Sequence, residues 1–119
     1  MMSGRSANTP VGRLRRRGAR VSEGPWTACG DTASDGRGRL IVALGRTAGS
    51  ATTRSRIRRI AREVFAERFG AAAGVDLLLL ARSNVDVHPR QQVRAGLGKL
   101  MTRLSSALAH RQTDQAAHG

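Results

Sequence analysis

Apolar positions recur with a helical period in two segments of the chain. The first runs from residue 50 to 69, where Ser50 is a suitable N-cap and Gly70 a suitable stop. Its apolar stripe consists of Ile57, Ile60, Ala61, Val64 and Phe65. The second covers residues 88 to 109, with Pro89 near its start. Its stripe consists of Val93, Leu97, Leu100, Met101, Leu104 and Leu108. Both segments are predicted to be amphipathic helices.

Shorter apolar runs between turn residues predict strands. Residues 75–81 contain four consecutive leucines, which indicates a strand that is buried on both faces and paired inside a sheet. Residues 39–46 are a β-branched and apolar run bounded by glycines, so a second strand is expected there. Residues 20–30 fit only an edge strand, because Pro25 cannot donate a ladder hydrogen bond. The composition of residues 31–38 predicts a turn or hairpin loop.

The N-terminal part of the domain predicts a short basic helix over PVGRLRRR, with Pro10 in its first turn and Gly18 as its stop. The resulting order is helix, two or three strands, basic helix, buried strand, helix, which is a small α+β sandwich. One domain over residues 10–109 is predicted, between disordered ends at 1–9 and 110–119.

Glycine lowers the helix propensity of the last helix at two positions. Gly96 and Gly98 each cost about 1 kcal/mol relative to alanine in a helix interior. The apolar pattern nevertheless continues through both positions, so the helix is retained in the prediction.

The charge of the chain points to a polyanionic partner. Its 119 residues include 21 basic and eight acidic side chains, for a net charge of +13, and Lys99 is the only lysine. Such an excess disfavours a compact chain by self-repulsion unless a partner neutralises it. Nucleic acid is the first candidate and an anionic membrane surface the second. A single cysteine, Cys29, excludes an internal disulfide and a multi-cysteine zinc site. No apolar run fits a signal peptide or a membrane span, so a cytoplasmic protein with no membrane association is predicted.

Arginines concentrate on the first long helix, at positions 54, 56, 58, 59 and 62. Arg54, Arg58 and Arg62 stack at i, i+4 spacing and repel one another, and only Glu63 and Glu67 offset them. The planar guanidinium group can donate two hydrogen bonds to one phosphate. The helix is therefore interpreted as a contact for a phosphate-bearing partner. A merely solvated basic face, with one or two arginines paired to the glutamates, is the alternative.

The chain offers no convincing hydrolytic centre of its own. His88, His110 and His118 lack metal-ligand spacing. Asp76 falls inside the buried strand and Asp86 in a loop, so they do not form a paired carboxylate site. No catalytic residue and no metal site are predicted on the protein.

The stretch RLIVALGRTAGSATTRSRIRRIAREVF resembles the protein component of bacterial ribonuclease P. That family has a strand, a short basic turn and a Gly-x-Ala-x-x-Arg-Asn-Arg-x-Lys-Arg helix. The matching positions here are Gly49, Ala51, Arg54, Arg56, Arg58 and Arg59. The similarity extends over about residues 11–108, through GVDLLLLAR and into the last helix.

The resemblance implies a two-layer sandwich of order αβββαβα, similar to domain 2 of ribosomal protein S5, with a left-handed crossover around the basic helix. It implies an accessory subunit of the endoribonuclease that removes the 5′ leader from precursor tRNA. The catalytic RNA would supply the hydrolytic centre and hold Mg²⁺. The basic helix would contact that RNA, and a cleft between the sheet and a helix would hold the leader. No obligate protein partner is expected.

These implications assign site residues position by position. The expected contacts to the RNA subunit are Arg46, Gly49, Arg54, Ser55, Arg56, Arg58, Arg59 and Arg62. The expected contacts to the leader are Val11, Leu14, Arg15 and Trp26. Trp26 could either stack on a leader base or belong to the core, and Gly49 could serve the turn or let RNA approach the helix N-terminus.

The chain departs from the family pattern at several of these positions. Ser55 stands in place of asparagine, Arg46 and Thr47 in place of two lysines, and Val11 and Leu14 where aromatic residues are usual. Two other functions remain open from the sequence. One is a structural RNA-binding protein, ribosomal or ribosome-associated, with no role in cleavage. The other is a nonspecific DNA-binding or membrane-surface module.

Overall fold

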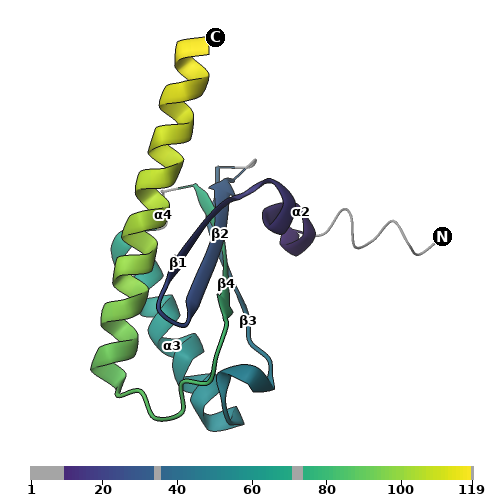
Figure 1. Ribbon diagram of the computed structural model, residues 1–119. Coiled ribbons are helices and arrows are strands. Elements are labelled where there is room, and N and C mark those ends of the chain that lie inside the picture. The colour runs from purple at the N-terminus through teal and green to yellow at the C-terminus, as the bar shows by residue number, and fades with distance from the viewer. Residues whose placement is uncertain (1–9, 34–35, 71–73, 119) are drawn as a thin grey trace, which may run out of the picture.

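A computed structural model of the chain describes residues 10–33, 36–70 and 74–118 (Figure 1). The elements are α2 (Pro10–Arg17), β1 (Ala19–Glu23), β2 (Trp26–Thr32), β3 (Arg39–Ala43), the 3₁₀ helix η1 (Arg46–Ala48), α3 (Ala51–Arg68), β4 (Val75–Ala81) and α4 (Arg90–His118). The predicted α+β order αβββαβα is confirmed. The predicted disordered segment 1–9 lies outside the described residues.

The sheet has the strand order β1-β2-β4-β3. β4 pairs antiparallel with β2 and parallel with β3, so it lies in the interior as its leucines predicted. The prediction of one edge strand over residues 20–30 is wrong. The segment forms a β1–β2 hairpin in which Glu23 faces Trp26, and β2 is an interior strand. Pro25 is compatible with this arrangement because it lies in the turn, where no ladder hydrogen bond is needed.

The segment between β2 and β3 is a connection and not a hairpin, because β4 separates these two strands. β3 is also shorter than predicted. It ends at Ala43, and Gly45 then begins the single turn of η1, in which Ala48 N–H donates to the Gly45 carbonyl at 3.1 Å. This turn leads the chain from the edge of the sheet to the start of α3.

Helices cover the two faces of the sheet unequally. α3 and α4 lie together on one face, and the short α2 lies on the other (Figure 1). The main core is on the two-helix side. It joins Trp26, Leu77 and Leu79 of the sheet to the predicted stripes of both helices, and every residue of those stripes is buried except the half-buried Phe65. A smaller cluster of Leu14, Cys29 and Leu78 holds α2 to the opposite face.

The ends of the long helices follow their caps. Ser50 Oγ accepts a hydrogen bond from Thr53 N–H at 3.2 Å, and Phe69 caps the C-terminus of α3 before Gly70. α4 continues to His118, whereas a disordered tail was expected from residue 110. The last turns of α4 extend beyond the end of the sheet (Figure 1).

Candidate RNA-binding interface

A loop that follows β4 anchors the N-terminus of α3. Asp86 Oδ1 accepts hydrogen bonds from Ser50 N–H at 3.0 Å and from Thr53 Oγ1 at 2.6 Å. Asn84 fixes the same carboxylate: its amide donates to Asp86 Oδ2 at 3.3 Å. These hydrogen bonds, first that from Thr53, lower the pKa of Asp86. The helix N-terminus therefore holds an anion supplied by the protein itself.

Gly49 belongs to this anchor. It is buried and has φ of 141°, a conformation that favours glycine. A Cβ at this position would lie 2.4 Å from Asp86 Oδ1. The absence of a side chain on Gly49 thus leaves room for the Asp86 carboxylate. Of the two roles expected for Gly49, that of a turn residue describes its position in the fold.

One side of α3 is neutralised by contacts with α4 and the loop before it; we call Arg56, Glu63 and Glu67 the docked flank. Arg56 Nη2 donates to the His88 carbonyl at 3.1 Å. Arg94 of α4 bridges the two glutamates, with Nη2 at 2.6 Å from Glu63 Oε1 and Nη1 at 3.3 Å from Glu67 Oε2. Both glutamates are therefore used to join the helices.

The other side of α3 carries Arg54, Arg58 and Arg62, which we call the bare flank. Their i, i+4 spacing aligns them on the side of the helix axis opposite the docked flank. Within the described part of the chain, none of the three has an acidic partner. Arg54 Nε is buried and makes no hydrogen bond. This leaves a row of guanidinium groups whose charge is not balanced by the fold.

The remaining predicted RNA contacts surround the bare flank. Ser55 and Arg59 are exposed on the outer surface of α3, and Arg46 is exposed on η1, which leads into the helix. A ligand that reaches the bare flank can therefore meet these side chains without a change in the fold. Of the eight positions expected to contact the RNA subunit, only Gly49 is buried.

The predicted leader contacts divide between the two faces of the sheet. Val11 packs beside Leu14 on the α2 side, where Ile41, Ala43 and Leu80 are half-buried. Two charged side chains border this face: Arg15 is exposed on α2, and the guanidinium of Arg13 contacts the buried carboxylate of Asp76 at 3.0 Å.

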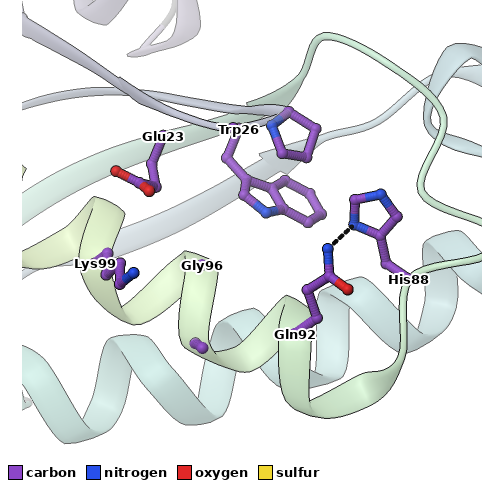
Figure 2. A pocket seen from close by; sticks show the side chains of 9 residues that line it. Glu23, Trp26, His88, Gln92, Gly96 and Lys99 are labelled. Atoms are coloured by element: carbon purple, nitrogen blue, oxygen red, sulfur yellow. Dashed lines mark hydrogen bonds between the residues drawn. The ribbon is translucent and has the colours of Figure 1, made fainter.

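Trp26 lies on the opposite face, in the main core. Its side chain is 1% exposed, which leaves no free ring face for stacking. Figure 2 shows its indole ring above α4, beside Gly96, with His88 on the far side of the ring. A Cβ on Gly96 would lie 3.1 Å from Trp26 Nε1, so this glycine makes room for the indole. The structure therefore does not bring Trp26 together with Val11 and Leu14.

Three contacts that fix the elements around the arginine helix and the sheet were not predicted from the sequence. The anchor made by Asp86, the Arg13–Asp76 pair and the Arg94 bridge join residues 33, 63 and 31 positions apart. The only local signal was a polar residue in each partner segment.

Among residues 10–33, 36–70 and 74–118, no group of three or more His, Cys, Asp or Glu side chains could hold a metal ion. In the same ranges, no helix is both long and apolar enough to cross a membrane.

Comparisons with known proteins agree with the geometry. The family model for ribonuclease P matches residues 12–105. A search of curated proteins found no match in sequence. The structure is similar to that of the Staphylococcus aureus RNase P protein, with 20% identity, a TM-score of 0.69, and coverage of 80% of this chain and 88% of that one. It is also similar to the RNase P protein from Thermotoga maritima, with 19% identity, a TM-score of 0.66, and coverage of 82% and 93%.

Both of these RNase P proteins share the fold of this chain, and the family model spans most of α2, the whole sheet, the arginine helix and just over half of α4. This match does not favour the alternative of a structural RNA-binding protein without a role in cleavage. The chain belongs to the ribonuclease P protein family: it is an RNA-binding protein subunit of the ribonuclease P that processes tRNA, and its partner is the ribonuclease P RNA.

Proposed function

We propose that the bare flank of α3 is the surface that binds the RNA subunit. One observation carries this proposal: Glu63 and Glu67 are both engaged by Arg94, while Arg54, Arg58 and Arg62 have no acid in the described residues. Guanidinium groups aligned on a rigid helix match successive phosphates of a folded RNA strand. Arg46, Ser55 and Arg59 extend the contact at its margins.

The anchor at the start of α3 supports this assignment. Because the Asp86 carboxylate occupies the helix N-terminus, a phosphate would meet electrostatic repulsion there. Phosphates are thereby directed to the arginine side chains and away from the backbone N–H groups. In this proposal Gly49 acts through Asp86 and does not touch RNA.

The 5′ leader of precursor tRNA is proposed to lie on the α2 side of the sheet. The half-buried Val11, Ile41, Ala43 and Leu80 give this face an apolar surface, and the exposed Arg15 adds charge at its border. Aliphatic side chains pack against bases but offer no aromatic stacking. We therefore expect leader binding to depend mostly on charge, with little preference among bases.

Hydrolysis is proposed to take place on the RNA subunit, which would hold the Mg²⁺ ions for that step, in the cytoplasm. The part of the protein is to neutralise phosphates where RNA strands converge, which lowers the concentration of divalent cation that the complex needs. If about five phosphates are engaged, the logarithm of affinity should fall with the logarithm of salt at a slope of roughly −3.5 to −4.5.

Cleavage of a 5′-extended precursor tRNA at low Mg²⁺ tests the proposal. A bacterial ribonuclease P RNA is assayed alone, with the protein, and with the Arg54→Ala, Arg58→Ala double variant. Acceleration by the wild-type protein that the double variant fails to give is expected. Equal acceleration by both proteins would overturn the assignment of the bare flank, and cleavage by the protein without RNA would overturn the placement of the hydrolytic centre.

A further inference from the structure

The outer face of α4, away from α2, carries three adjoining hollows that share Lys99. The first, of about 220 Å³, lies between the β1–β2 turn and the start of α4. The second, of about 450 Å³, and the third, of about 270 Å³, follow toward α3 and are both bordered by Arg68. Neither the bare flank nor the α2 side of the sheet contributes a residue to them.

Planar and polar groups line the first hollow (Figure 2). The buried indole of Trp26 lies beneath the floor of the hollow, and the half-buried His88 ring lies at one end. Gln92 Nε2 lies 3.3 Å from His88 Nδ1. Because Nε2 faces the imidazole, the Gln92 carbonyl oxygen points away from it and makes no hydrogen bond among the described residues. This end offers one flat imidazole surface and one amide acceptor.

Lys99 lies at the other end of the first hollow, beside Glu23 (Figure 2). Glu23 is paired with Arg103, whose Nε is 3.1 Å away, so the carboxylate does not neutralise the lysine. In the described chain Lys99 has no acidic partner, and Arg68 donates only to Thr102 Oγ1, at 2.8 Å. Two cations that border the same hollows are thus left unbalanced.

The two glycines that lower the helix propensity of α4, Gly96 and Gly98, each lie against a side chain that borders these hollows. Gly96 makes room for the indole of Trp26, as described above. A Cβ on Gly98 would lie 3.2 Å from Arg68 Nη2, so the second glycine makes room for the guanidinium. Each glycine costs helix stability and places one of the groups that border the hollows.

We propose that this face is a second RNA site, which takes one unstacked nucleotide of a single-stranded segment. The base enters the first hollow, stacks against the His88 ring above the buried Trp26, and donates from its polar edge to the Gln92 amide oxygen. The adjacent phosphate lies between Lys99 and Arg68. The site is separate from the bare flank and from the leader surface, and it rests only on the RNA-binding function of the family.

The chain provides a direct probe of this site. Trp26 is the only tryptophan of the chain, which has no tyrosine, so the intrinsic fluorescence comes from a residue that borders the first hollow. Titration with the single-stranded RNA hexamer A₆ should change the Trp26 emission saturably, and inorganic phosphate should not. Lys99 is the only lysine, so its acetylation, read by peptide mass spectrometry, should slow as the hexamer binds.

Two variants separate the base from the phosphate. Ala95→Leu adds aliphatic bulk at an exposed helix position that borders the first and third hollows, and it adds neither a charge nor an aromatic ring. By occupying the space of the base it should weaken the fluorescence-detected affinity for A₆ by about tenfold. Lys99→Gln should weaken it several-fold and reduce the salt slope by about 0.7. Arg17→Gln, which removes an exposed cation from the end of α2, is the matched control and should leave the Trp26 titration nearly unchanged.

The outcomes decide the proposal. If A₆ binds by anisotropy but leaves the Trp26 emission and the Lys99 acetylation rate unchanged, the site does not exist. If Ala95→Leu has no effect and Lys99→Gln and Arg17→Gln act equally, the attraction is diffuse charge and the nucleotide pocket is refuted. Failure here leaves the bare flank untouched, because the precursor tRNA cleavage assay reads that surface separately.

Discussion

The two flanks of α3 carry arginines from the same short stretch of sequence and use them in opposite ways. On the docked flank, Arg56 reaches the His88 carbonyl, and Arg94 bridges Glu63 and Glu67. On the bare flank, Arg54, Arg58 and Arg62 stack without an acidic partner in the described residues. Charge that the fold balances fixes the helix to its neighbours, and charge that the fold leaves unbalanced is available to RNA.

The largest expected effect is the loss of two arginines from the bare flank. Arg54→Ala combined with Arg58→Ala should lower the affinity for the RNA subunit by roughly 100-fold, because each lost contact with a charged group costs about 1.5–3 kcal/mol. The salt slope should become less steep by about 1.4–1.8. Filter binding over a range of salt concentrations measures both quantities. An unchanged slope would show that these side chains do not meet phosphates.

The next effect concerns the anchor that orients both flanks. Gly49→Ala places a Cβ against Asp86 at positive φ and should reduce the free energy of unfolding by about 1–3 kcal/mol. Denaturant unfolding gives the value. Adding Asp86→Ala to Gly49→Ala removes the close contact but not the backbone strain. The double variant should therefore lose less stability than the two single changes together; simple additivity would show that the contact is unimportant.

A matched pair of single variants compares the flanks directly, since each removes one arginine. Arg58→Ala should weaken RNA binding by about tenfold and leave stability within about 0.5 kcal/mol. Arg94→Ala should do the reverse, lowering stability by about 0.5–1 kcal/mol, since its ion pairs are partly exposed, with a small effect on RNA binding. Equal loss of affinity in both variants would remove the distinction between the flanks.

The smallest effect is the pH dependence of the anchor. Hydrogen bonds from Thr53 and Ser50 lower the pKa of Asp86, so its ionised form is favoured in the folded state. This contribution to stability is present above the ordinary aspartate pKa and is lost as pH falls through the lowered value. Asp86→Asn should lower Tm at neutral pH and narrow its gap to wild type in acid. A gap that stays constant with pH would contradict the role of the charge.

Local sequence determined much of the fold. Ser50 and Gly70 marked the ends of α3, four leucines marked an interior strand, and the stripe of Val93 to Leu108 marked the buried side of α4. These features depend on neighbours within one or two turns or strand steps, which periodicity reads directly. The same periodicity showed that the arginines of α3 must lie off its buried stripe.

Only the tertiary structure decided which charges remain free. Arg94 and Glu63 are 31 positions apart and Asp86 and Thr53 are 33 apart, so no local pattern could show that they meet. The burial of Trp26 likewise depends on Gly96, which α4 brings against the β1–β2 hairpin. Strand order places these segments together, and it follows from the whole chain. β4 takes the interior position because pairing on both edges and cover on its two faces bury Leu77, Leu78 and Leu79.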